Sequence, residues 1–153
     1  MERTTLAYLR RSGNYLMLHR TGKIGDINSG KWLGVGGHFE EGETPEMCIR
    51  REILEETGFV AGELVFCGEV FFDSDSYPPE TMYLYVCDDF SGEMAQCDEG
   101  ELVWIPENRL GELPMWEGDS VFLEMIRQGR TNFYLHLVYE GSSLKKYQIS
   151  NLY

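Results

Sequence analysis

Apolar and polar residues alternate in short runs along most of the chain, a pattern typical of strands in a partly covered sheet. The runs at 4–11 and 13–20 are divided by Ser12-Gly13 and predict a hairpin. Further strands are expected at 31–37, 64–72, 81–88 and 101–105. Two more, at 133–139 and 144–149, predict a closing hairpin with Glu140-Gly141-Ser142-Ser143 as its turn. The segments 21–30 and 73–80 are rich in loop-forming residues and are expected to be a loop and a turn.

Two segments carry the signals of helices. Thr44 can serve as an N-terminal cap, Pro45 suits the first helical position, and Gly58 stands where a C-terminal cap belongs, so a helix is predicted at 45–57. A second helix is expected at 120–128. Hairpins combined with two principal helices predict an α/β (α+β) fold, a mixed β-sheet sandwiched between helices. Because no repeat, linker or low-complexity tract interrupts the sequence, residues 1–153 are expected to form a single domain.

Composition adds limits on location and partners. A chain of 153 residues with 42% hydrophobic residues is long enough to bury a core of its own. No apolar run approaches the roughly 18 to 20 residues that span a bilayer, and the first residues do not resemble a signal peptide. We therefore expect a cytoplasmic protein without a membrane partner. The net charge of -13 argues against a DNA or RNA duplex as partner, because phosphate backbones need a basic surface.

Cysteine and histidine residues do not indicate a zinc site. No CxxC pair is present, and the histidines lack the spacing of zinc ligands. Free thiols in a reducing compartment are the simpler interpretation. The residues concerned are Cys48, Cys67, Cys87, Cys97, His19, His38 and His136.

Three carboxylates share one face of the first predicted helix. Residues advance about 100° per position, so Glu52, Glu55 and Glu56 fall within an arc of about 100°. Like charges at this spacing destabilise a helix by a few tenths of a kcal/mol per pair. Mg²⁺ prefers carboxylate oxygens and would compensate the repulsion. The alternative is a solvated acidic face, which is the commonest meaning of a run of charge.

The residues around these carboxylates form a longer pattern. Gly37 is followed after five residues by Glu43, and after seven more by Arg51-Glu52-Ile53-Leu54-Glu55-Glu56-Thr57-Gly58-Phe59. This arrangement, Gx5Ex7REUxEExGU with U aliphatic or aromatic, resembles the Nudix box without a departure. The resemblance implies a Nudix hydrolase, a divalent-metal enzyme that cleaves the phosphate chain of a nucleotide.

Each part of the box also has a physical role. Gly37 ends a strand, and its free carbonyl can point at a metal. Arg51 can hold the neighbouring carboxylates with its planar fork of donors, although Arg51 and Glu43 could also form an ordinary surface ion pair. The resemblance implies that Glu52 and Glu56, with Glu55 nearby, bind Mg²⁺ or Mn²⁺ and that the metal activates a water. Such cations would also let an acidic protein hold an anionic substrate.

A further carboxylate is expected from a later loop, as is common in the Nudix family. The candidates lie in Asp98-Glu99-Gly100-Glu101. By position, Glu99 is favoured as an additional ligand or general base and Glu101 comes second, while a plain acidic turn is the alternative. The sequence leaves open which carboxylate is the base and how many metal ions bind.

The similarity extends beyond the box to the MutT-like branch, which hydrolyses oxidised purine nucleoside triphosphates. It is carried by Gly30-Lys31-Trp32 through Gly36-Gly37, the strand with Trp104, Met115-Trp116, Gly118-Asp119-Ser120 and the closing hairpin. It implies that Trp116 stacks on the base and that Asp119 hydrogen-bonds to the purine edge, roles that suit an indole face and a carboxyl group. The alternatives are a core aromatic residue and a helix cap.

Several positions near the expected base pocket qualify this resemblance. The relatives most similar in layout have asparagine in place of Leu33 and a second aspartate in place of Gly118, so a preference for the 8-oxo base is not implied. Arg20 and Lys31 are candidate phosphate contacts, or else ordinary surface residues. Trp32 is expected in the core rather than at the ligand.

The leading hypothesis is a metal-dependent pyrophosphohydrolase that converts a nucleoside triphosphate, with oxidised purines such as 8-oxo-dGTP among the candidates, to the monophosphate and pyrophosphate. One alternative is a Nudix hydrolase of another nucleoside diphosphate derivative, such as ADP-ribose, a nucleotide sugar or a dinucleoside polyphosphate. A second is a non-catalytic module that senses nucleotides. The sequence does not indicate the oligomeric state.

Overall fold

The computed structural model describes residues 1–21 and 25–153, so part of the predicted loop 21–30 lies outside the described residues. The other residues of that loop, 21 and 25–30, lie outside helices and strands, as expected. The elements are β1 (Glu2–Arg11), β2 (Asn14–Arg20), β3 (Trp32–Leu33), β4 (Val35–His38), α1 (Pro45–Thr57), β5 (Val60–Ala61), β6 (Val65–Ser74), β7 (Glu80–Cys87), β8 (Phe90–Ser91), β9 (Gly100–Pro106), the 3-10 helix η1 (Glu107–Glu112), α2 (Asp119–Arg127), β10 (Phe133–Glu140) and β11 (Ser143–Asn151).

Most strands in the described part of the chain form one mixed sheet, in the order β11-β10-β6-β7-β1-β2-β3, with β4 also paired to β1 and β9 to β2. The pairs β1–β7 and β6–β10 are parallel, whereas β1–β2, β6–β7 and β10–β11 are antiparallel. The sheet is therefore mixed, as the alternation of hairpins and helices predicted.

The first hairpin opens soon after its turn. β1 and β2 are paired at Arg10 with Tyr15 and at Arg11 with Asn14. Beyond that point β4 pairs with β1 and β9 pairs with β2. The strand expected at 31–37 is consequently wrong as a single element: β3 joins β2, whereas β4 joins β1. The break falls at Gly34, where an added Cβ would lie 2.6 Å from the carbonyl oxygen of Ala7.

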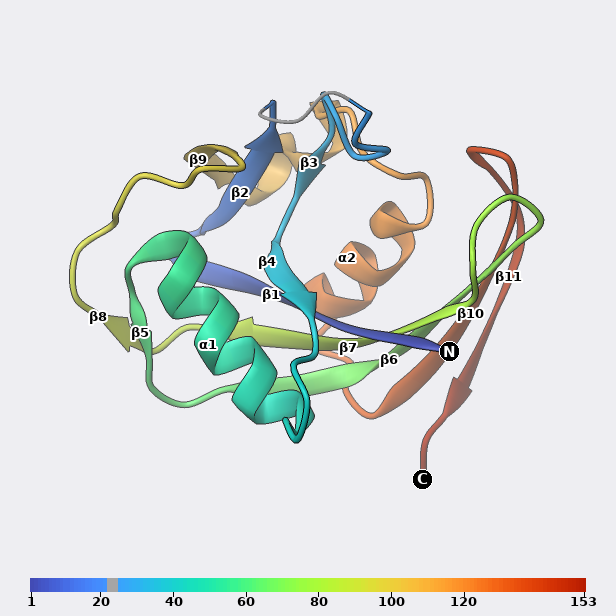
Figure 1. Cartoon of the computed structure of the whole chain (residues 1–153), viewed down its shortest axis with the longest axis horizontal. Helices are drawn as coiled ribbons and strands as arrows, with labels where there is room; N and C mark the ends of the chain where they lie inside the picture. Colours follow the sequence, from blue (N-terminus) through green and yellow to red (C-terminus); the bar gives the residue numbers. More distant parts are fainter. Residues whose placement is uncertain (22–24) are drawn as a thin grey trace.

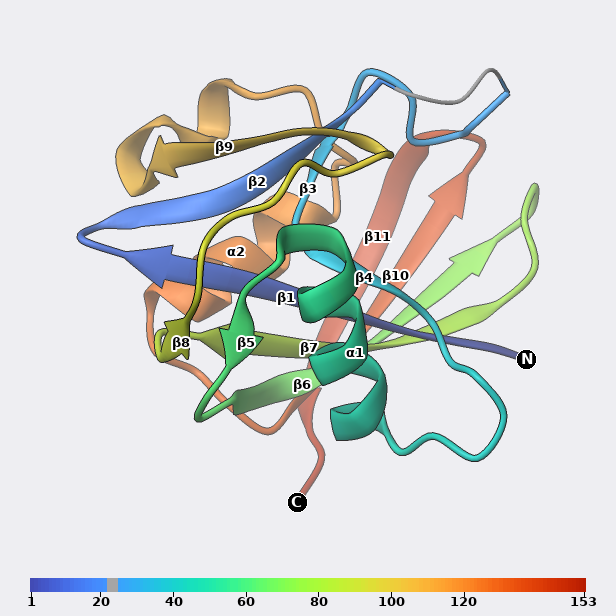
Figure 2. The same ribbon diagram turned by 60° about the vertical axis from the view of Figure 1, so that its left-hand side comes forward.

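The two helices cover opposite faces of the sheet (Figures 1 and 2). In β1, Leu6 and Tyr8 belong to the core cluster that includes residues of α2, whereas Ala7 and Leu9 belong to the cluster that includes residues of α1. A strand covered on both sides is buried at successive positions, as residues 4–9 are. The predicted sheet between helices is therefore confirmed.

Local signals fix the helix that carries the box. The Thr44 side chain accepts a hydrogen bond from the Met47 N–H, and Pro45 begins the helix. Gly58 ends it in the left-handed region at φ 81°, with its N–H bonded to the Leu54 carbonyl. The bounds of α1 match the prediction, and α2 begins and ends one residue earlier than predicted. In the part of the chain that the structure describes, no helix combines the length and the apolar character needed to cross a membrane.

Candidate active site

The three acidic residues on α1 differ in their surroundings. Glu56 points into the protein and is only 6% exposed. Glu52 is largely covered as well, whereas more than half of the Glu55 side chain is exposed. The predicted acidic face is therefore not evenly solvated, because its carboxylates range from buried to open.

Two glycines let β4 lie directly against these carboxylates. The Gly36 N–H donates to Oε1 of Glu56 at 2.8 Å. An added Cβ at Gly37 would lie 2.8 Å from the Glu52 carboxyl carbon, and one at Gly36 would lie 2.9 Å from Cα of Leu6. A side chain at Gly37 would push β4 away from the Glu52 carboxylate, whereas one at Gly36 would collide with the backbone of β1. The Gly37 carbonyl accepts a long hydrogen bond of 3.4 Å from Thr5 Oγ1.

Arg51 links several acidic groups of the box rather than one. Its Nε and Nη2 donate to the two carboxylate oxygens of Glu43 at 2.7 and 2.9 Å. Its Nη1 donates to Glu52 at 2.8 Å and to Glu55 at 3.1 Å. The hydrogen bonds from Arg51 to Glu43 are the main reason that the pKa of the Glu43 carboxyl is lowered to about 2. A lone surface ion pair does not describe this arrangement, in which one guanidinium fixes the positions of three carboxylates.

Glu99 is the later carboxylate that reaches the box. Its carboxyl group makes a side-chain contact with Glu56. The pKa of Glu56 is raised, first because burial disfavours its charge and then because Glu99 lies beside it, although the Gly36 N–H acts in the opposite direction. Glu101 is exposed and lies opposite His19 in the β2–β9 ladder.

The segment before Glu99 is hydrogen-bonded to the end of α1. The Ala95 N–H donates to the Thr57 carbonyl at 2.7 Å. On its other side, Glu99 accepts a hydrogen bond from Nη1 of Arg20 at 3.2 Å. Arg20 also pairs with Asp26 at 2.8 Å. Arg20, a candidate phosphate contact, is thus bonded to two carboxylates next to the box.

Trp116 and Asp119 come together on the α2 side of the sheet. Trp116 Nε1 donates to the Asn28 side chain at 2.7 Å, and the Lys31 ammonium lies 4.6 Å from the centre of the Trp116 ring. Tyr139 meets the same ring edge-on at 5.7 Å. Lys31 therefore sits over an indole face, where a cation–π interaction holds it.

Asp119 is buried without a hydrogen-bond partner for Oδ2 among the described residues. It is the first residue of α2, so the N-cap position falls on Gly118 rather than on Asp119, and no side-chain hydrogen bond caps this end of the helix. Burial raises the pKa of Asp119 to about 8. The helix-cap interpretation of Asp119 therefore does not account for its carboxyl group.

Tyr8 is a residue of this region that the sequence analysis missed. Its ring is fully buried beside Phe122, and its hydroxyl, like Oδ2 of Asp119, has no partner among the described residues. The Asp119 carboxyl contributes to a raised pKa of the Tyr8 hydroxyl, after burial itself. In the sequence Tyr8 is one more apolar member of a strand, so only its hydroxyl could have drawn attention to it.

The two departures from the MutT-like pattern have different surroundings. Leu33 is half-buried in β3 and lies opposite Leu18. Gly118 donates its N–H to the Tyr139 hydroxyl at 2.7 Å, and an added Cβ would lie 2.6 Å from Leu137. An aspartate at position 118 would therefore require these neighbours to move. Trp32 stacks on His19 at 4.4 Å and packs against the core, in keeping with its expected role.

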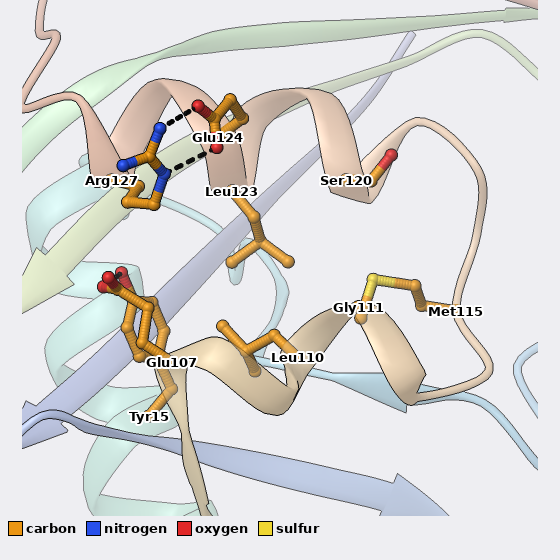
Figure 3. Close-up of a pocket in the computed structure, with 9 residues that line it drawn as sticks. All are labelled: Tyr15, Glu107, Leu110, Gly111, Met115, Ser120, Leu123, Glu124 and Arg127. Carbon is orange, nitrogen blue, oxygen red and sulfur yellow. Dashed lines mark hydrogen bonds and ion pairs between the residues drawn. The ribbon is translucent and has the colours of Figure 1, made fainter.

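A separate cleft of about 180 Å³ lies between η1 and α2 (Figure 3). Its lining includes the apolar side chains of Leu110, Met115 and Leu123, together with Arg127, which pairs with Glu124. None of the predicted site residues is among the described residues that line it. The carboxylate site and this cleft are therefore distinct.

Comparison with known proteins identifies the family. The NUDIX domain model matches residues 2–126, so the chain belongs to the Nudix family. It is 31% identical over 106 residues to the oxidized purine nucleoside triphosphate hydrolase of Danio rerio, across 67% of this chain and 66% of that protein, just under two thirds of the relative's length. It is 29% identical over 135 residues to the uncharacterized Nudix hydrolase YvcI of Bacillus subtilis, across 85% of this chain and 82% of the relative.

A solved structure shares the fold of this chain. The structure of a MutT protein from Bacillus halodurans superposes with a TM-score of 0.87 at 24% identity and covers 97% of each chain. The predicted Nudix membership, the MutT-like resemblance and the mixed fold are confirmed by these similarities.

Proposed function

We propose that this Nudix hydrolase is a divalent-metal pyrophosphohydrolase that converts a nucleoside triphosphate to the monophosphate and pyrophosphate. The observation that carries the proposal is the buried Glu56 carboxylate, which receives one N–H from Gly36 and lies against Glu99. Adjacent carboxylates in a covered site repel each other when both are charged. A divalent cation would remove that repulsion and would also attract the phosphates of a substrate.

The donor set fits Mg²⁺ or Mn²⁺. Glu52, Glu56 and Glu99 would hold the ion, with Glu55 and the Gly37 carbonyl beside them, and all of these donors are the oxygen atoms that hard cations prefer. When bound, such an ion polarises the phosphate chain and lowers the pKa of a bound water.

The protein's own side chains have separate tasks in this proposal. Arg51 positions Glu52 and Glu55 through its hydrogen bonds to both. Glu99 is partly exposed and is held by Arg20, so its carboxylate can accept the proton of the attacking water. Lys31 and Arg20 are the cationic groups from which the outer phosphates would receive hydrogen bonds.

The substrate class is argued from Trp116 and Asp119. An indole face can stack on a base, and Lys31 at 4.6 Å from the ring centre would give way to it. A carboxyl group whose pKa is raised to about 8 stays largely protonated at neutral pH, so Asp119 can both donate to and accept from a purine edge. Together with the name of the Danio rerio relative, these groups favour purine triphosphates, oxidised purines such as 8-oxo-dGTP included.

A hydrolysis screen with Mg²⁺ tests the proposal. The substrates are canonical and oxidised nucleoside triphosphates, ADP-ribose and dinucleoside polyphosphates, and the products are identified. We expect pyrophosphate and the monophosphate from purine triphosphates. Cleavage of diphosphate-linked substrates alone would move the assignment to the alternative Nudix class, and cleavage of none would favour a nucleotide-sensing module.

A variant pair ties the activity to the box. The double variant Glu52→Gln, Glu56→Gln replaces both carboxylates by isosteric amides. Its turnover should fall by orders of magnitude while the fold persists. Glu46→Gln is the matched control, because Glu46 is an exposed acid of the same helix that pairs with Arg50. Undiminished Mg²⁺-dependent hydrolysis by the folded double variant would refute the proposal.

A further inference from the structure

Three potential metal ligands meet at the start of β1, outside the carboxylate site. Glu2, His38 and Glu80 each place one ligand atom within 4.8 Å of the others. The sheet register brings them together, because Glu2 lies opposite Glu80 in β1–β7 and Thr4 lies opposite His38 in β1–β4. Residues that are paired or two apart on neighbouring strands project from the same face. The cluster is therefore built by three adjacent strands.

This face is not the one that carries the box. Thr5, the next residue on β1, bonds to the Gly37 carbonyl and contacts Cys48 of α1. Leu6 and Met82, which continue the face of Glu2 and Glu80, pack in the cluster that includes α2 residues. Because successive residues of a strand point to opposite faces, the cluster and the box carboxylates are separated by the sheet.

One member of the cluster is held by a hydrogen bond, and the other two form a long, exposed pair with each other. Thr4 Oγ1 donates to Glu80 Oε2 at 2.9 Å, and Thr4 is buried. A hydrogen bond of this kind orients a metal-binding carboxylate from behind. His38 Nε2 lies 3.5 Å from Glu2 Oε2, beyond the usual range of a hydrogen bond, and both side chains are about half exposed or more. The imidazole nitrogen and the Glu2 carboxylate can therefore rotate toward a ligand.

We propose that Glu2, His38 and Glu80 bind a first-row transition ion of the Zn²⁺ class, with Thr4 positioning Glu80. Zinc binds imidazole nitrogen and carboxylate oxygen at about 2.0 to 2.2 Å, which places ligand atoms about 3.4 Å apart in a tetrahedron. Ligand atoms now within 4.8 Å need only small side-chain rotations to reach that spacing. The imidazole selects Zn²⁺, Co²⁺ or Ni²⁺ over the Mg²⁺ proposed for the box, which favours oxygen ligands alone.

Co²⁺ is the probe that separates this site from the other ligands of the protein. The full chain is dialysed against Co²⁺ with Mg²⁺ in large excess, and bound Co²⁺ is counted while the visible spectrum is recorded. We expect a bound equivalent with the visible d–d bands of four-coordinate Co²⁺ and without the intense thiolate absorption that binding to cysteine would produce. The same equivalent should persist in Glu52→Gln, Glu56→Gln.

Two variants locate the bound ion. His38→Gln and Glu80→Gln should each weaken Co²⁺ binding tenfold or more. The matched control is His136→Gln, because His136 forms a comparable pair with Asp73, 3.0 Å from Nε2, on another part of the sheet. Wild-type affinity in His38→Gln, or loss of the equivalent in Glu52→Gln, Glu56→Gln alone, would overturn the proposal. Since His38 is exposed, its replacement leaves the core intact and the comparison remains valid.

Discussion

Asp119 shows how burial changes the chemistry of a single residue. Its carboxyl group is 3% exposed, and the pKa is raised to about 8 because the charged form loses its hydration. An orphaned carboxylate in such a place would be costly, so the group stays protonated at neutral pH. A protonated carboxyl can offer one donor and one acceptor at a base edge, whereas an ionised carboxylate can only accept.

This environment makes stability depend on pH. The folded-state pKa of Asp119 lies above its unfolded value of about 3.9, so the native state binds the extra proton between these values. Protonation of Asp119 stabilises the native state. This contribution is complete below about pH 4 and is lost as the pH rises through about 8. Asp119→Asn cannot titrate, and its free energy of unfolding should therefore rise relative to wild type by up to a few kcal/mol across that window.

Urea unfolding of both proteins at a series of pH values measures this difference. The neighbouring phenols of Tyr8 and Tyr139 do not interfere, because burial raises the pKa of both above the window. A constant offset between the two proteins from pH 4 to 8 would contradict the argument and would mean that the Asp119 carboxyl is solvated or paired.

At the scale of elements, the end of α1 and the segment that leads to Glu99 depend on Gly58. Its φ of 81° suits glycine, and an added Cβ would lie 2.8 Å from the Glu93 carbonyl oxygen and 2.9 Å from Cβ of Ala95. Gly58→Ala should therefore lower the free energy of unfolding by more than the roughly 1 to 2 kcal/mol that a left-handed alanine costs by itself. Because the displaced segment carries Glu99, kcat should fall as well.

Gly129 supplies the matched control for Gly58. It has a similar φ of 74° after α2, but an added Cβ would meet nothing within 4 Å. Gly129→Ala should therefore show the conformational cost alone, with unchanged hydrolysis. Denaturant unfolding and kcat measured side by side distinguish the two effects. Equal losses of stability and of kcat in both variants would show that the close approach of Glu93 and Ala95 to position 58 does not control Glu99.

The elements that the sequence predicted best are those with local signals. Thr44, Pro45 and Gly58 define α1 within its own sequence, and the spacing of the box then places Glu52 and Glu56 on one face. The division of 31–37 at Gly34 and the opening of the first hairpin could not be predicted in this way. They depend on which strands pair with β1 and β2, a choice made by residues far away in the sequence.

The candidate site shows the same difference between what local sequence signals predict and what distant residues decide. Glu99 was favoured by its position after the box, and the structure places it beside Glu56. The neighbours of Trp116 and Asp119 were not predictable, because Asn28 lies 88 residues from Trp116 and Tyr8 is still farther from Asp119 in the chain. Hydrophobic periodicity places a residue on a face, but the neighbour of that residue is decided by packing.

At the scale of the whole molecule, the net charge of -13 is unevenly compensated. Arg51 gathers Glu43, Glu52 and Glu55, and Arg20 gathers Asp26 and Glu99, so two guanidinium groups carry much of the compensation around the site. Self-repulsion of the remaining charge destabilises the compact state. Any cation will screen this repulsion, but an ion held by the proposed box site would in addition bind the native state specifically.

Thermal unfolding separates these two effects. An ion that binds only the native state at a hundredfold excess over Kd stabilises it by about 2.7 kcal/mol, which corresponds to roughly 5 to 10 °C in a protein of this size. NaCl at matched ionic strength should give a smaller shift, since it only screens. Glu52→Gln, Glu56→Gln should lose the difference between Mg²⁺ and NaCl. Glu41→Gln, Glu93→Gln removes the same charge from exposed positions and should keep that difference. A Mg²⁺ shift that NaCl reproduces, or one that persists in the box variant, would place the stabilising cations on the general surface rather than at the Nudix box.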